Sequence, residues 1–221
     1  NGLISNLSVK SKLLAITLMF SGVLMGVVIY TITTLKQQQA DSTLVNIAGR
    51  QRMLTQKFAK ELFEDLALGN SDLQGAVSSD TAKLFELSLQ ALRNGGETYA
   101  DLAMAVPVTL PQNHVPEIEA KLQQVGQLWG ELQAAVLQVT QGQPGATGYA
   151  ATMKRIGSLN LEVLDAMNGA VSMLAEQSAN KVNSMISVEW GMLVLALPVG
   201  IWFSFMISSG ITRPLDLMVD T

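Results

Sequence analysis

Several residue types that support chemistry in small proteins are absent or scarce in this chain of 221 residues. Cysteine is absent, which excludes disulfide bridges and any metal or redox site built on thiolates. The one histidine, His114, lies in a proline-rich stretch without a second ligand beside it, so we predict an exposed residue that binds no metal. Charged residues make up only 14% of the chain and apolar residues 48%, a balance too apolar for a soluble domain unless the apolar residues are concentrated in membrane spans.

Enzyme motifs are also lacking. The chain contains no G-x-S-x-G nucleophile motif, no phosphate-binding P-loop and no dinucleotide-binding glycine motif. Its carboxylates are scattered beside lysines and arginines, which is typical of solvated helix faces. We therefore predict a protein that is not an enzyme and that needs neither a metal nor a cofactor. A closed pocket with convergent carboxylates would indicate the opposite.

Two uncharged runs contain much of the apolar excess. Residues 13–35 and 190–212 each hold 23 residues without a charge, and a helix of that length is about 35 Å long, enough to cross a hydrocarbon core of about 30 Å. The first run is too long for the apolar region of a signal peptide, and no small-residue cleavage site follows it. We predict two transmembrane helices. Lys10 and Lys12 before the first span and Arg213 after the second place both ends in the cytoplasm.

The predicted organisation follows from these spans. A cytoplasmic segment (1–12) precedes the first span (13–35), an extracytoplasmic domain covers 36–189, and the second span (190–212) leads into 213–221. Because the chain begins with Asn1 rather than methionine, we expect it to be part of a longer protein.

Helical spacing between the spans predicts four helices. The first continues from the membrane to residue 68, the second occupies 81–93 behind an N-cap at 78–80, and the fourth runs from 149 into the second span. The predicted buried stripes are Leu84, Leu87 and Leu89 in the second helix, Ile118, Leu122, Val125, Trp129, Leu132, Val136 and Val139 in the third, and Leu164, Met167, Val171, Leu174, Met185 and Val188 in the fourth. An all-α, antiparallel four-helix bundle follows. The glycines and prolines of 94–116 predict an irregular segment with at most a helical turn at 98–104.

The first helix beyond the membrane has two faces of different composition. One is apolar and predicts a bundle core, at Ile47, Leu54, Phe58 and Leu62. The opposite face carries one arginine among small or short polar residues, at Gly49, Arg52, Gln56 and Ala59. Such a surface allows another helix to approach closely, and a two-fold-related copy of the chain is the simplest partner.

If two such helices meet, Arg52 faces its copy across the axis, and the two guanidinium groups repel unless an anion lies between them. Gly49, one turn earlier, leaves room for a small planar anion. The alternative is that the basic residues of this helix only solvate it and pair with nearby carboxylates, with Arg50, Arg52, Lys57 and Lys60 facing Glu61, Glu64 and Asp65.

Residues 46–56, NIAGRQRMLTQ, resemble the opening motif of the PilJ-type sensor domain of type IV pili methyl-accepting chemotaxis transducers. Residues 91–96, Trp129 and 164–171 also resemble that family. The same motif is similar to the anion-binding helix of nitrate/nitrite sensor histidine kinases, matched by Asn46, Ala48, Gly49, Arg52 and Met53. The resemblance implies a homodimer that holds nitrate or nitrite at its two-fold axis. Arg50 and Gln51 depart from the kinases, and Arg50 joins the five matching residues as a predicted ligand contact.

The resemblance also implies a multi-pass protein of the bacterial inner membrane with a periplasmic sensor domain. Residues 211–215, ITRPL, look like the start of a HAMP signal-relay module, and a chemotaxis signalling domain is the expected output. A histidine kinase or diguanylate cyclase is the alternative output. A module that binds a pilus subunit or a periplasmic protein is the alternative function, and it predicts an exposed apolar patch at 69–79 or 142–148.

Overall fold

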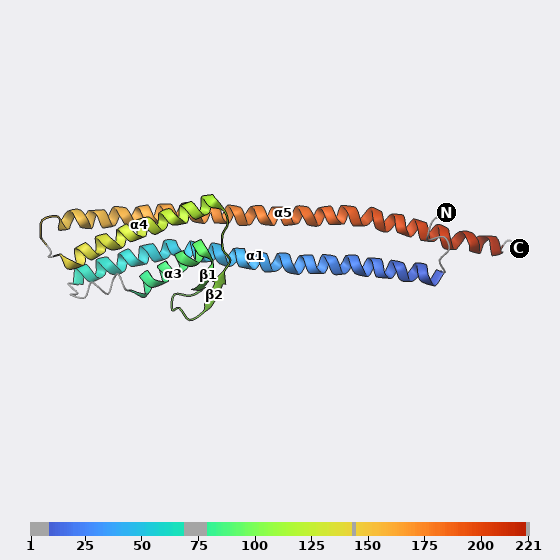
Figure 1. The fold of residues 1–221 in the computed structure, drawn as a ribbon, viewed down its shortest axis with the longest axis horizontal. Coiled ribbons are helices and arrows are strands. Elements are labelled where there is room, and N and C mark those ends of the chain that lie inside the picture. Colours follow the sequence, from blue (N-terminus) through green and yellow to red (C-terminus); the bar gives the residue numbers. More distant parts are fainter. Residues whose placement is uncertain (1–8, 69–78, 143–144, 220–221) are drawn as a thin grey trace. The chain divides into compact units, whose positions relative to one another are not determined.

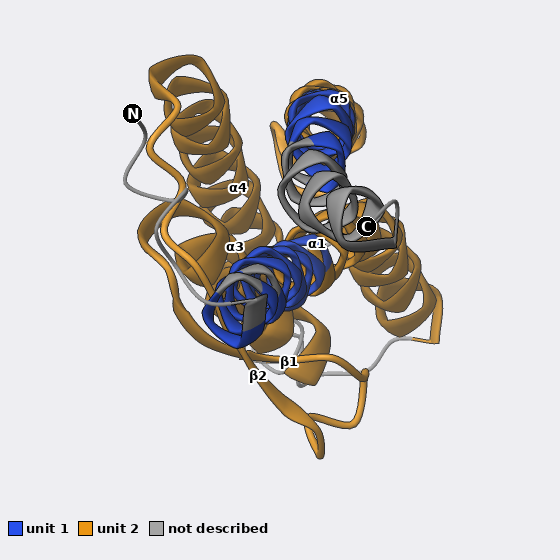
Figure 2. Ribbon diagram, turned by 90° about the vertical axis from the view of Figure 1, so that its right-hand side faces the viewer, with its two compact units in different colours: residues 1–38, 180–221 blue, residues 39–179 orange. Residues whose placement is uncertain are grey.

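A computed structural model describes residues 9–68, 79–142 and 145–219 (Figure 1). The elements follow in the order α1 (Val9–Leu68), α3 (Asp80–Asn94), β1 (Gly96–Tyr99), β2 (Pro107–Leu110), α4 (Pro116–Gln141) and α5 (Tyr149–Val219). The chain divides into two compact units, Gln39–Ala179 and the pair of segments Asn1–Gln38 and Asn180–Thr221 (Figure 2). The predicted all-α class is confirmed, with one small hairpin added.

The unit 39–179 is a helical bundle whose core draws on α1, α3, α4 and α5. All seven residues of the predicted α4 stripe are buried, because their alternating steps of four and three keep them on one side of the helix. The predicted core face of α1 is buried as well, at Ile47, Leu54, Phe58 and Leu62. Each large apolar side chain removed from water in this way stabilises the fold by about 1.5–3 kcal/mol.

The start of α3 is as predicted. The Ser79 hydroxyl accepts a hydrogen bond from the backbone N–H of Ala82 at 3.2 Å, which satisfies one of the free donors of the first turn. Leu84 and Leu89 are buried, but Leu87 is 40% exposed, so the prediction for Leu87 was wrong. The buried face of α3 is centred between the other two leucines, and Leu87 lies outside it.

The fourth helix matches its predicted stripe in part. Met167 and Leu174 are buried, whereas Leu164, Val171 and Met185 are only partly covered. Val188 is 44% exposed, so the prediction for Val188 was wrong. The α5 core contains smaller residues that the sequence stripe did not include, such as Ala166 and Ala170.

The segment between α3 and α4 is a β-hairpin, so the predicted helical turn at 98–104 is wrong. Strands β1 and β2 pair antiparallel from Gly96 opposite Leu110 to Tyr99 opposite Pro107. Gly95 ends α3 with φ 73°, and a Cβ there would lie 2.8 Å from the Gln112 nitrogen, so only glycine fits without strain. Figure 1 shows the hairpin beside α3, at the edge of the bundle.

The other unit contains the apolar ends of α1 and α5. Helices long and apolar enough to cross a membrane occur within Leu13–Leu68 and Tyr149–Trp202, and the most apolar window of each is not buried in the chain. That exposure distinguishes them from the core helices of a soluble protein. The two helices approach each other at Gly200, where an added Cβ would lie 3.6 Å from the ring of Phe20.

Candidate functional site

The site predicted from the sequence centres on Arg52, which is exposed on α1. Its Nε donates to the backbone oxygen of Gly49, 3.4 Å away and three residues earlier. A Cβ added at Gly49 would lie 3.7 Å from Nη2 of Arg52, so the guanidinium lies over the glycine. The spacing of one helical turn brings these two residues together, as predicted from the sequence.

A second contact holds Arg52 from another helix. Its Nη1 donates to Oδ1 of Asn168 on α5 at 3.3 Å. Within the described ranges, Arg52 forms no ion pair with a carboxylate, so its charge is not compensated by an acidic residue of its own chain there. Asn168 was not singled out from the sequence, although it lies within the 164–171 segment that resembles the family.

The surface around Arg52 contains most of the other predicted residues. Asn46 is exposed one turn before Gly49, and Met53 is 43% exposed beside the arginine. Gln56 continues the same exposed face by one turn. Between Asn46 and Gln56, the exposed side of α1 therefore carries one cation, Arg52, among uncharged residues.

Two of the six predicted residues point elsewhere. Ala48 is fully buried, at 0% exposure, so its side chain packs in the bundle core and not on the exposed face that carries Arg52. Arg50 is half-buried and faces α3 and the hairpin, away from Arg52. Ala59, predicted to lie on the same face as Gly49 and Arg52, is also buried, so that prediction was wrong. Contact of any of the six predicted residues with a ligand stays a prediction.

Arg50 joins three segments of the bundle. Its Nη2 donates to the Ser88 hydroxyl at 3.0 Å and its Nη1 to the backbone oxygen of Asp101 at 3.3 Å. The Ser88 hydroxyl also pairs with that of Thr98 in β1, 2.9 Å away. Burial lowers the pKa of Arg50, and the charge of Asp101 opposes that shift. Gln51, the other departure from the sensor kinases, donates its Nε2 to the backbone oxygen of Phe85 at 2.7 Å. Arg50 and Gln51, the two residues that differ from the sensor kinases, therefore both connect α1 to α3.

Asp101 closes the loop of the hairpin. Its carboxylate accepts hydrogen bonds from the backbone N–H groups of Val106 at 2.8 Å and Ala105 at 3.0 Å. The hydrogen bond from Val106 lowers the pKa of Asp101, desolvation opposes the shift, and the bond from Ala105 adds to it. The carboxylate therefore stays ionised to a lower pH than an ordinary aspartate does.

Two lysines of α1, Lys57 and Lys60, follow the alternative interpretation. Lys57 pairs with Glu61 and Lys60 with Glu64, each one turn apart and partly or fully exposed. Such surface pairs contribute little stability. The two arginines do not take part in them, which separates Arg52 from the ordinary solvated cations of this helix.

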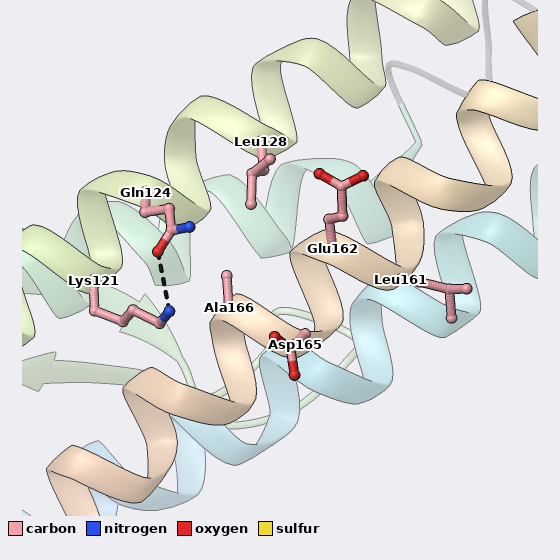
Figure 3. A pocket seen from close by; sticks show the side chains of 7 residues that line it. All are labelled: Lys121, Gln124, Leu128, Leu161, Glu162, Asp165 and Ala166. Carbon is pink, nitrogen blue, oxygen red and sulfur yellow. Dashed lines mark hydrogen bonds between the residues drawn. The ribbon is translucent and has the colours of Figure 1, made fainter.

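A groove of about 290 Å³ lies between α4 and α5 (Figure 3). Lys121 crosses it with its Nζ bonded to Gln124 Oε1 at 3.0 Å, and its side chain packs where a Cβ on Gly169 would lie. The carboxylates Glu162 and Asp165 on its α5 side are exposed to solvent. The groove is open and is not an enclosed pocket of convergent carboxylates.

Metal binding has no support in the described segments, where no group of three or more histidine, cysteine, aspartate or glutamate side chains could hold an ion. His114 is exposed, as predicted. Trp129 is 3% exposed and lies between aromatic neighbours, so it belongs to the core rather than to a binding pocket.

Comparison with known proteins identifies the class. Residues 33–156 match the PilJ family, described as the N-terminal domain of type IV pili methyl-accepting chemotaxis transducers. Of the described elements, the match covers α1 from residue 33, α3, the hairpin, α4 and the start of α5. The chain belongs to this family, and the resemblance stated from residues 46–56 is confirmed.

A curated relative is the methyl-accepting chemotaxis protein McpN of Pseudomonas aeruginosa, 28% identical over 153 residues. The alignment covers 69% of this chain but 26% of the relative, so the chain spans about a quarter of that protein. Among solved structures, the ligand-binding domain of the P. aeruginosa nitrate receptor McpN is similar, with 28% identity, a TM-score of 0.45, and coverage of 62% of this chain and 96% of that one.

Proposed function

We propose that the chain is the ligand-sensing and membrane-anchoring part of a chemoreceptor that works as a homodimer and binds a small oxyanion, nitrate or nitrite, between the Arg52 side chains of two copies. The observation that carries the proposal is the state of Arg52. It is exposed, has no carboxylate partner in the described part of the chain, and lies over a glycine in the stretch 46–56 of α1, whose other exposed residues are uncharged. The relative McpN is described as a nitrate receptor, which supports this class of ligand.

The electrostatics favour a bridging anion. Two guanidinium groups brought together across a two-fold axis repel each other, and an anion between them replaces repulsion by attraction. In each copy the Nε and one Nη1 hydrogen of Arg52 are used within the chain, which leaves the Nη2 group and the second Nη1 hydrogen. Four charge-assisted bonds at about 1.5–3 kcal/mol each give roughly 6–12 kcal/mol before losses, and micromolar affinity needs about 8.

Titration calorimetry on the chain in detergent micelles tests the site. We expect heat with nitrate and a stoichiometry of one anion for two chains, with no heat for Arg52→Ala. Arg155→Ala is the matched control, because it removes an exposed arginine that pairs with Glu131 on another surface. Absence of binding by nitrate and nitrite at millimolar concentration, or unchanged binding by Arg52→Ala, would overturn the proposal.

We also propose the topology implied by the basic flanks: both chain ends in the cytoplasm, the bundle in the periplasm, and a HAMP module after Arg213 that relays to a chemotaxis output. Because the chain has no cysteine, single cysteines report on topology. A membrane-impermeant maleimide added to whole cells should label Ser158→Cys in the bundle and leave Lys10→Cys unlabelled. The reverse pattern would contradict this orientation.

The alternative, a module that binds a protein partner, predicted an apolar patch at 69–79 or 142–148. Most of the first stretch and residues 143–144 lie outside the described residues, so that prediction is not tested. The described surface supplies no observation that favours it over the anion site.

A further inference from the structure

Asn168 is the described residue that connects the candidate anion site to a second helix. Its Oδ1 accepts a hydrogen bond from Arg52 Nη1 at 3.3 Å, although the two residues lie 116 positions apart in the chain. Asn168 is half-buried on α5, between the buried Met167 and Gly169, which packs against Lys121. Its position is therefore held by the packing of α5, whereas Arg52 lies on an exposed face of α1.

The two contacts of Arg52 restrain its guanidinium plane. The backbone oxygen of Gly49 binds Nε from α1, and Asn168 binds Nη1 from α5. A planar group held at two of its nitrogens keeps little freedom to rotate. The free Nη2 edge is then already oriented for a ligand, and less conformational entropy is lost on binding.

The geometry points to Asn168 as the positioning residue that orients Arg52 for the anion and couples the occupancy of the site to α5. This inference rests on the proposed function and adds the contact through which anion binding on α1 affects another helix. α5 runs as one continuous helix from Tyr149 to Val219, so a change at Asn168 acts on the helix that carries the second apolar run. An amide suits this role because it holds the guanidinium without compensating its charge.

Asn168→Ala separates this role from plain stability. We expect nitrate affinity to fall about three- to tenfold, the range for the loss of one hydrogen bond, while the melting temperature without nitrate stays unchanged. Asn168→Asp should weaken binding by about a further tenfold, because a carboxylate would compensate the Arg52 charge. Ser172→Ala, an exposed change one turn later on α5, is the matched control and should bind as the wild type does.

Coupling is measured separately from affinity. A spin label on Glu176→Cys, the only cysteine in the chain, reports the distance between the α5 helices of a dimer in lipid nanodiscs. Saturating nitrate should shift this distance in the otherwise wild-type chain and leave it unshifted when Asn168→Ala is added.

The outcomes distinguish this inference from the proposed function. If the wild type binds nitrate and Asn168→Ala retains either its affinity or its label shift at saturation, the role of Asn168 is overturned and the anion site stands. An Asn168→Ala chain that melts earlier without nitrate would assign Asn168 to stability and also overturn the inference. If the wild type binds no oxyanion, both proposals fall.

Discussion

The Arg50 guanidinium lies 3.0 Å from the Ser88 hydroxyl of α3, while Arg52, two residues later, is exposed and contacts Asn168 of α5. Each residue turns an α-helix by about 100°, so side chains two positions apart point about 160° away from each other. The motif therefore places one arginine inside the bundle framework and the other on its open face. These two residues of the same type have opposite structural surroundings.

Removal of Arg50 should affect stability. We expect Arg50→Ala to lower the free energy of unfolding by about 1–3 kcal/mol, because the buried Ser88–Thr98 pair and the Asp101 carbonyl lose their shared donor. Arg52→Ala, at an exposed position, should change it by less than about 0.5 kcal/mol. Unfolding followed by circular dichroism in detergent measures both. Equal losses for the two variants would contradict the division of roles.

Substitution of Gly49 should separate helix stability from ligand access. A Cβ at this position makes an ordinary 3.7 Å contact with Arg52, and alanine is favoured over glycine in a helix, so Gly49→Ala should raise stability by up to about 1 kcal/mol. Gly49→Leu should displace the guanidinium and reduce nitrate affinity at least about tenfold. Gly157→Leu, where a Cβ meets nothing within 4 Å, is the control for added bulk on a helix. Calorimetry in which Gly49→Leu binds nitrate normally would argue against an anion held over this glycine.

Acid should release the hairpin loop. Hydrogen bonds from Val106 and Ala105 lower the pKa of Asp101 below its unfolded value of about 3.9, so the ionised carboxylate stabilises the loop at neutral pH. That contribution is lost as the pH falls through the lowered pKa, below about pH 4. Asp101→Asn should show faster hydrogen exchange at the Val106 amide already at pH 7, and Asp165→Asn should not. Equal exchange in wild type and Asp101→Asn would exclude this role.

Trp129 should be the most sensitive position of the core. Its ring stacks on Phe85 at 4.0 Å and contacts Phe58 at 4.8 Å, and its Nε1 donates to Glu86 at 3.2 Å. We expect Trp129→Ala to cost about 3–5 kcal/mol of unfolding free energy, and Trp129→Phe about 1–2 because the stacking is kept. Leu161→Ala, at a side chain 62% exposed, should cost less than about 0.5 kcal/mol. Thermal unfolding that ranks these variants differently would place the core elsewhere.

The regular parts of the fold were predictable because their signals are local. The α4 stripe repeats over six turns, and the Ser79 cap precedes α3, so both could be located without knowledge of the partners. The hairpin was missed because its strands are four residues long and lie among glycines and prolines that also mark loops. Its pairing depends on Thr98 and Leu110 being buried against the bundle, which no local pattern displays.

The sequence by itself determined the two apolar helices, the four-helix bundle, and the placement of Gly49 and Arg52 on one face of α1. These features depend on helical period and composition, which act between neighbours a turn apart. Only the tertiary structure decided that Arg50 binds α3 and the hairpin, and that Arg52 meets Asn168. Those contacts join residues 38, 51 and 116 positions apart, and the packing of whole helices sets which of them meet.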